Sequence, residues 1–295
     1  MKKFNIICEI LSSELNKRNS IILEHIYFDS LFKNLLTYCN NYLMTTDELL
    51  KLTYSDLNTL IDSHWSGKKY LNKHKELYIL FYGNLNKIDW ISKEELNKIY
   101  ERMKQNDGLF CSDFENNKNV GLIIINEIPY AEYKRVLMHE FIHFFQWNLG
   151  KSIYQFQTSV LDDKEVEEIS KILKLNISVI QSMITHIQDA QELESYCNNI
   201  FDYLKEFCKE HKLLFNKFVL SAICDCCYNK FNETFEEYYK NVIKNFKNNL
   251  SIDIDIDFKS KYLIYILLLG YFKHGFNSFK NHLFGYYEKE RNKEN

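Results

Sequence analysis

The chain has 295 residues, a formal net charge of -3 and a pI near 6.3. A chain of this length can bury a large core without metal or disulfide cross-links, so a bound metal would serve chemistry rather than folding. The nearly balanced charge gives no electrostatic reason to expect a nucleic acid or an anionic membrane as a partner.

The cysteines and the amino terminus both favour a reducing compartment. The eight cysteines are scattered and do not form the regular framework of a small disulfide-linked protein. Near the amino terminus, Glu9 interrupts the apolar run before the core of a signal peptide is complete. We therefore expect a cytoplasmic protein.

The predicted elements change in character along the chain. Apolar residues at helical spacing predict a helical segment over residues 1–75. The following region, 76–295, is predicted to be one domain whose carboxyl-terminal half is helical. Its predicted strands are ELYILFYG (76–83) and GLIIIN (121–126), and its predicted helices are 93–104, 131–149, 162–173, 179–208, 212–228 and 261–272. These elements predict an α+β fold, mostly helical, with a small sheet packed on the helix over 131–149.

The most apolar stretch, residues 262–272, is about half as long as the roughly 20 residues that a membrane-spanning helix needs. We therefore expect it to be a buried core helix and not a membrane span.

Two other features suggest metals at first sight. Asp253, Asp255 and Asp257 alternate in SIDIDIDF, but the central Gly and distal Glu of a calcium loop are missing, which favours a strand with one acidic face. Cys224, Cys226 and Cys227 cluster without a second Cys or His pair at zinc-finger distance. We interpret these three as buried thiols.

The segment with the clearest chemistry is His-Glu-Phe-Ile-His at residues 139–143. On a helix, His139 and His143 lie one turn apart on one face, so both imidazoles can reach a single zinc ion. Glu140 points about 100° round the helix, where it can act as a base without binding the metal. Chance would produce this pattern in roughly two such sequences per hundred, but the apolar helix around it makes buried polar side chains costly without partners.

A catalytic zinc ion usually has three protein ligands. A third histidine in the arrangement HExxHxxGxxH is absent, because Gln146 and Leu149 occupy the Gly and His positions. A downstream acid is therefore expected. On a helix over 179–208, Glu194 falls on the apolar stripe, whereas Glu192 shares a face with Thr185, Gln188, Ser195 and Asn199, which we interpret as solvated. We predict Glu194 as the third ligand, with Glu192 as the alternative.

These residues resemble the gluzincin branch of the zincin metallopeptidases, which pair HExxH on one helix with a Glu on a following helix. The resemblance covers residues 76–208 and implies one zinc ion per chain, held by His139, His143 and Glu194, with Glu140 as general base. It also implies a strand along the substrate cleft, for which GLIIIN is the candidate. The oxyanion-stabilising residue is not assigned; the candidates are His186, His274, His282, Tyr286 and Tyr287.

The function expected from this resemblance is hydrolysis of a peptide or protein substrate by water that zinc binds and Glu140 deprotonates. One alternative is a zincin-shaped binding or regulatory protein without turnover. Another is a different metallohydrolase such as a deformylase, although the Cys ligand of that motif is missing. A third is a helical protein in which the motif is accidental.

Overall fold

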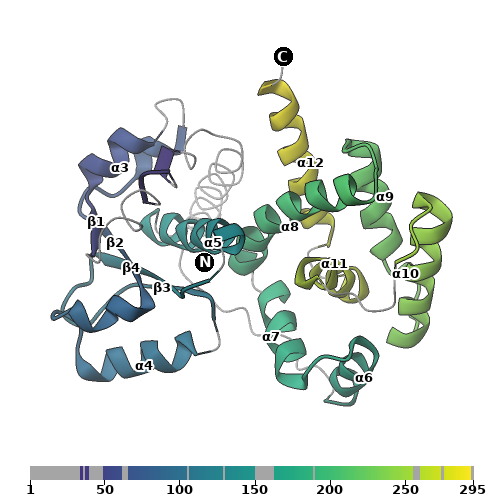
Figure 1. Cartoon of the computed structure of the whole chain (residues 1–295), viewed down its shortest axis with the longest axis horizontal. Helices are drawn as coiled ribbons and strands as arrows, with labels where there is room; N and C mark the ends of the chain where they lie inside the picture. The colour runs from purple at the N-terminus through teal and green to yellow at the C-terminus, as the bar shows by residue number, and fades with distance from the viewer. Residues whose placement is uncertain are drawn as a thin grey trace, which may run out of the picture. The chain divides into compact units, whose positions relative to one another are not determined.

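The computed structural model describes residues 34–35, 37–39, 49–61, 66–104, 106–128, 130–149, 163–188, 190–254, 260–273 and 276–293. The chain forms two compact units, Met1–Ile153 and Tyr154–Asn295. The first contains a small mixed sheet with helices, and in its described residues the second is helical (Figure 1). The fold is therefore α+β and mostly helical, as the sequence predicts.

The sheet of the first unit has four strands in the order β1-β2-β4-β3. β2 and β4 are parallel, with Glu76 opposite Val120, while β1 and β3 join the two sides in antiparallel orientation. The strand bounds are β1 (Leu50–Leu52), β2 (Glu76–Phe81), β3 (Gly108–Cys111) and β4 (Val120–Ile125).

Both faces of β4 are buried, which explains why VGLIII lacks polar residues. Ile123 and Ile125 face α5 (Tyr130–Asn148), in a core that contains Phe141 and Phe144 of that helix. The opposite face, which carries Leu122 and Ile124, packs with residues of α4 (Lys93–Met103). The helix that carries HEFIH therefore lies directly on the sheet, as expected.

Side-chain hydrogen bonds fix the ends of these helices. α4 begins with a capping box, in which the Ser92 hydroxyl accepts from the Glu95 N–H and the Glu95 carboxylate accepts from the Ser92 N–H. At the carboxyl end of α5, Lys75 Nζ donates to the Trp147 carbonyl over 2.6 Å and lies 3.7 Å from the centre of the indole ring. Asn148 Oδ1 accepts from the Asn72 N–H over 2.8 Å. These contacts fasten α5 to the chain just before β2.

The remaining elements of the first unit are short. They are α3 (Tyr54–Leu60), whose first turn is capped by Thr53, and the 3-10 helices η1 (Ser66–Tyr70) and η2 (Tyr82–Lys87).

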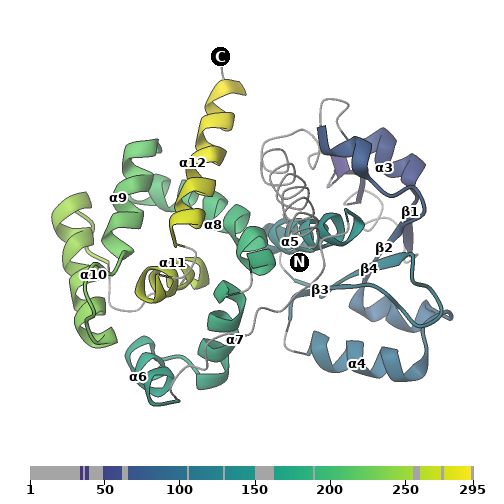
Figure 2. The ribbon, with the colours of Figure 1, turned by 180° about the vertical axis from the view of Figure 1, so that it is seen from behind.

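In the second unit, helices surround an apolar central one, α11 (Lys261–Phe272) (Figure 2). It packs against α7 (Ile177–Gln188), α8 (Ala190–Glu210) and α9 (Lys217–Cys227). Its residues from Tyr262 to Gly270 are all buried, so the prediction of a core helix is confirmed. None of the helices described has both the length and the apolar character needed to cross a membrane. The other helices are α6 (Asp163–Leu173), α10 (Phe235–Leu250) and α12 (Phe276–Lys293).

The structure differs from the predicted boundaries in several places. The division of the chain lies at residue 153 and not near 75, because β1 pairs with β2 and residues on both sides of position 75 share one core. The predicted helix over 179–208 is two helices, α7 and α8. Residues 251–254 do not form a strand, while Asp255 and Asp257 lie outside the described residues.

The interpretation of the cysteine cluster is confirmed. Cys224, Cys226 and Cys227 lie on α9 and are buried, free thiols. Burial raises the pKa of Cys224 to about 12 and that of Cys226 to about 11. These side chains therefore stay protonated and inert near neutral pH.

Candidate metal centre

HEFIH lies in the middle of α5, and its residues divide between two environments. Phe141 and Ile142 are fully buried in the core of the first unit. His139 and His143 are half-buried, and Glu140 is buried with 6% of its surface exposed. The apolar residues between the histidines thus anchor the helix to the sheet and hold the three polar side chains in place.

The two histidines face one another through the same ring nitrogen. His139 Nε2 and His143 Nε2 are 3.1 Å apart, and the ring planes are inclined at 78°. Two nitrogens bound to one tetrahedral zinc ion at 2.0–2.1 Å would be separated by about 3.3 Å. The observed separation is close to this value, so the pair fits zinc without rearrangement of the helix.

Gln146 holds one of these rings. Its side-chain oxygen Oε1 lies 3.0 Å from His143 Nδ1 and can only accept a hydrogen bond, so Nδ1 carries the proton. In a neutral ring, Nε2 of His143 then has its lone pair available. This is the tautomer that a ligand to zinc through Nε2 must adopt. In the sequence, Gln146 stands out only because it excludes a metzincin arrangement, but its spacing of three residues from His143 is the signal for this contact.

Glu140 lies against the first residue of β3. A Cβ atom at Gly108 would be 3.0 Å from Glu140 Oε1 and 2.4 Å from Cγ1 of Val136, so only glycine fits at this position. The close approach places the buried carboxylate of Glu140 against the start of β3. A general base has to lie within hydrogen-bond reach of the proton that it takes.

β3 is the strand at this edge, and the expectation that GLIIIN lines the cleft is wrong. β4, which contains most of that sequence, pairs on both sides and lies inside the sheet. Within the described residues β3 pairs only with β4. The Asn126 N–H donates to the Asp107 carbonyl, so the alternation of an antiparallel pair turns the backbone groups of Gly108 and Phe110 away from β4. The sequence Asn106-Asp107-Gly108 is typical of a turn, so the sequence alone does not predict β3.

Cys111 is the last residue of β3, and the charge of Glu140 affects the pKa of its thiol. Burial raises the pKa of Cys111 to about 12, the guanidinium of Arg102 opposes this change, and the carboxylate of Glu140 adds to it.

The two candidates for the third ligand both lie near the start of α8 in the second unit. The side chain of Glu194 lies outside the described residues, so its predicted role is not tested. Glu192 is half-buried. Its face is not the solvated surface that the sequence suggested, because Ser195 is fully buried and Asn199 is 4% exposed. α8 therefore presents a buried polar stripe that begins at Glu192.

Most of the candidates for the oxyanion-stabilising residue have packing contacts within the second unit. His186 Nδ1 lies 3.0 Å from the hydroxyl oxygen of Tyr265. The ring of Tyr286 packs on Phe201, and that of Tyr287 on Phe215. His282 is half-buried, and His274 lies outside the described residues. These contacts do not single out one of the five.

Comparison with known proteins finds no relative of this chain. No protein-family model, no curated protein and no solved structure matches the chain.

Proposed function

We propose that the protein is a zinc metallopeptidase in which His139 and His143 bind the metal and Glu140 is the general base. The observation that carries the proposal is the convergence of the two Nε2 atoms at 3.1 Å, next to the carboxylate of Glu140, which contacts the first residue of β3. Burying two histidines and a glutamate in an apolar helix lowers the stability of the fold. A functional requirement for these three residues explains why the helix contains them.

A carboxylate of α8 is proposed as the third ligand. Glu192 is favoured among the described acids, because it begins the buried polar stripe that contains Ser195 and Asn199. Glu194 remains the alternative from the sequence pattern. A set of two histidines and one carboxylate is common at catalytic zinc ions and leaves one position for water.

The open edge of β3 gives the substrate its proposed place. An extended peptide can pair with the outward N–H and C=O groups of Gly108 and Phe110, as an added strand. Such pairing recognises the peptide backbone and therefore suits a peptidase. It also brings the peptide carbonyl that will be attacked close to Glu140, because Glu140 contacts the start of this strand.

When bound, zinc supplies a Lewis acid that polarises the peptide carbonyl and makes water more acidic. Glu140 accepts a proton from the attacking water, whose oxygen forms a bond to the carbonyl carbon. As the C–N bond breaks, Glu140 returns the proton to the leaving amine nitrogen. His143 keeps its orientation throughout, because Gln146 holds Nδ1. We also propose a cytoplasmic location, which suits the free thiols of the described cysteines.

The direct test is digestion of a mixed peptide library by the zinc-loaded full chain, followed by mass spectrometry. The wild type should cleave internal peptide bonds, and Glu140→Gln should lose at least about 100-fold of the rate while it keeps its zinc. Zinc binding without cleavage of any peptide would support a zincin-shaped binding protein instead. Cleavage that is unchanged in Glu140→Gln would contradict the assigned base.

A further inference from the structure

β3 runs along α5, with its contacts in the same order on the strand and on the helix. Gly108, the first residue of β3, lies against Glu140. Two residues further along, the ring of Phe110 packs on that of Phe144, with 6.3 Å between the ring centres. Glu140 and Phe144 lie one helical turn apart on one face of α5. The position of β3 along this face therefore decides which part of an added peptide strand lies next to Glu140.

A third contact holds the chain where β3 ends. The indole Nε1–H of Trp147 donates to Asp113, whose two carboxylate oxygens are each 3.2 Å from the nitrogen. The indole ring also packs on Phe110, with 5.9 Å between the ring centres. Trp147 has 5% of its surface exposed and lies two helical turns beyond Glu140, on the same face of α5. The helix therefore contacts the strand at its start, at its middle and just beyond its end.

The backbone and the charge of Asp113 both fit this contact. Its φ angle is 59°, a left-handed conformation that Asp adopts more readily than most residues with a side chain. Lys75 lies over the indole ring of Trp147, and its Nζ donates to the Trp147 carbonyl. Burial lowers the pKa of Lys75 and the carboxylate of Asp113 opposes this change, so the two charges attract each other. Lys75, Trp147 and Asp113 thus form one connected cluster at the end of α5.

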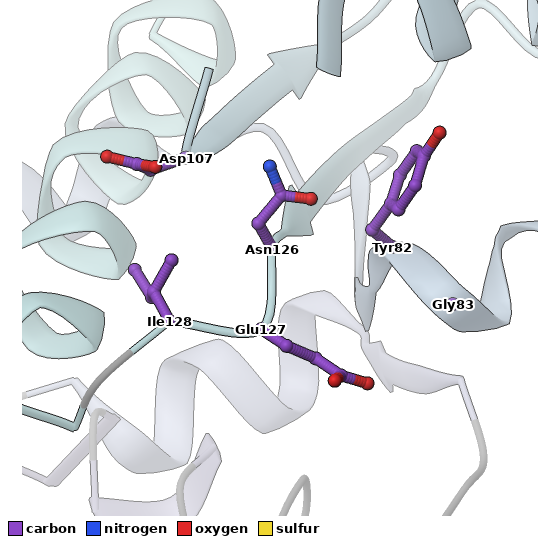
Figure 3. A pocket seen from close by; sticks show the side chains of 6 residues that line it. All are labelled: Tyr82, Gly83, Asp107, Asn126, Glu127 and Ile128. Atoms are coloured by element: carbon purple, nitrogen blue, oxygen red, sulfur yellow. The ribbon is translucent and has the colours of Figure 1, made fainter. Parts of the chain in front are cut away.

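The start of β3 is held in a different way, beside the pocket of Figure 3. Asp107 and Asn126 line this pocket, and the Asn126 N–H donates to the Asp107 carbonyl over 2.9 Å. The carboxylates of Asp107 and Glu127 point away from each other in Figure 3, so they do not form a joint charged site. A backbone bond therefore fastens the start of β3 to β4, whereas a side-chain bond fastens the segment beyond its end to α5.

We propose that Trp147 and Asp113 are positioning residues, which hold β3 along α5 so that a peptide added to this strand is aligned with Glu140. The inference rests on the proposed function and adds the means by which the site aligns its substrate. Neither residue touches the peptide, and both act through the backbone of β3. A strand that is already in place binds a peptide without the entropic cost of being ordered. Losing the bond should therefore weaken peptide binding, while the zinc affinity of α5 stays unchanged.

The test measures peptide binding by the zinc-loaded Glu140→Gln variant, which does not consume its ligand. The probes are fluorescein-labelled decapeptides of random sequence, and fluorescence anisotropy gives the dissociation constant. Adding Trp147→Phe, which keeps a ring but lacks the N–H donor, should raise this constant about three- to tenfold; the effect is modest because Asp113 is exposed. The matched control is Trp90→Phe, the same change in the core on the other face of the sheet, which should bind as the parent does.

Changes at Asp113 test the same bond from the other side. Asp113→Gly adopts a positive φ easily but lacks the carboxylate, so it should weaken binding as Trp147→Phe does. Asp113→Asn keeps an acceptor and tolerates the same φ, so it should stay within about twofold of the parent. Trp147→Phe and Asp113→Gly together should weaken binding no more than either change alone, because both break one bond.

The outcomes separate the two proposals. Measurable binding with one dissociation constant in the parent, Trp147→Phe and Asp113→Gly would overturn the positioning role and leave the peptidase intact. Weaker peptide binding with an equal loss of zinc affinity, measured by competition with a chelator, would also overturn it, because the cluster would then act on the stability of α5. Absence of binding for every decapeptide in the parent would count against both proposals.

Discussion

His139 and His143 differ in how their surroundings prepare them for a metal. The ring of His143 is oriented by an amide only three residues away on the same helix, at a Gln146 side chain with 1% of its surface exposed. A hydrogen bond to the ring nitrogen opposite the metal fixes the tautomer and raises the basicity of the ligand. In the proposed zinc site, Gln146 is thus a positioning residue that acts through His143.

Replacing Gln146 tests this role at the scale of one residue. Gln146→Leu should raise the dissociation constant for zinc about 10- to 100-fold, because His143 loses the acceptor that fixes its tautomer. Gln146→Glu retains an acceptor and should stay within a few-fold of the wild type. Competition with a chromogenic chelator measures both constants, and circular dichroism verifies the fold. Equal zinc affinity in all three proteins would contradict the role.

At the scale of the elements, β3 matters because it brings a glycine against α5, the helix that carries HEFIH. Gly108 leaves the space that Val136 and Glu140 of α5 occupy. The same short strand leaves one side unpaired in the described part of the chain. The packing of α5 and the proposed binding of a peptide substrate therefore both involve a strand of four residues.

Gly108→Ala should destabilise the first unit by about 1–3 kcal/mol, because the added Cβ would lie 2.4 Å from Cγ1 of Val136. Urea unfolding measures the loss. The matched control is Gly285→Ala, where a Cβ has no neighbour within 4 Å and no loss is expected. In a Val136→Ala background, the cost of Gly108→Ala should fall. An unchanged cost there would refute the proposed steric origin.

A second prediction at this scale concerns the two acids at the start of α8. Glu192→Gln should weaken zinc binding by at least about tenfold, since an amide oxygen lacks the charge of the carboxylate. Glu194→Gln, two residues away on the same helix, is the matched control and should bind zinc as the wild type does. The reverse pattern in equilibrium dialysis would assign the ligand to Glu194.

At the scale of the whole molecule, both units contain thiols whose ionisation burial opposes. Burial raises the pKa of Cys39 and of Cys224 from 9.0 to about 12. Because the folded-state pKa is higher than the unfolded one, the stabilisation is complete below pH 9 and is lost as the pH rises toward 12.

The free energy of unfolding should therefore fall above pH 9. Each fully buried thiol should account for about 1 kcal/mol between pH 9 and pH 10. Urea titrations at these two values measure the change, and Cys224→Ala should reduce the difference between them. Stability that stays constant from pH 8 to pH 10 would contradict the burial of these thiols.

The sequence predicts elements best where the signal is local. The helix over 131–149 and the placement of His139, Glu140 and His143 follow from the helical repeat alone, and α5 has them as expected. The four residues of β3 carry no such signal, because they follow Asp107 in a turn-like sequence and become a strand only by pairing with β4.

The two acids of α8 show a different limit. If residues 179–208 formed one continuous helix, residues before and after position 189 would share its faces at a regular spacing. The chain instead forms two helices, α7 and α8. A break between helices resets the angular relation of residues on either side. The continuous helix therefore predicts Ser195 and Asn199 on the solvated side with Thr185, whereas the structure buries both.

The most direct test of the central claim is the zinc content of the full chain, purified without an affinity tag and measured by elemental analysis. The wild type should contain about one zinc ion per chain, His139→Ala and His143→Ala should each contain close to none, and the exposed-residue control His74→Ala should match the wild type. A wild type that takes up no zinc from excess metal, or histidine variants that retain it, would contradict the metal centre on α5.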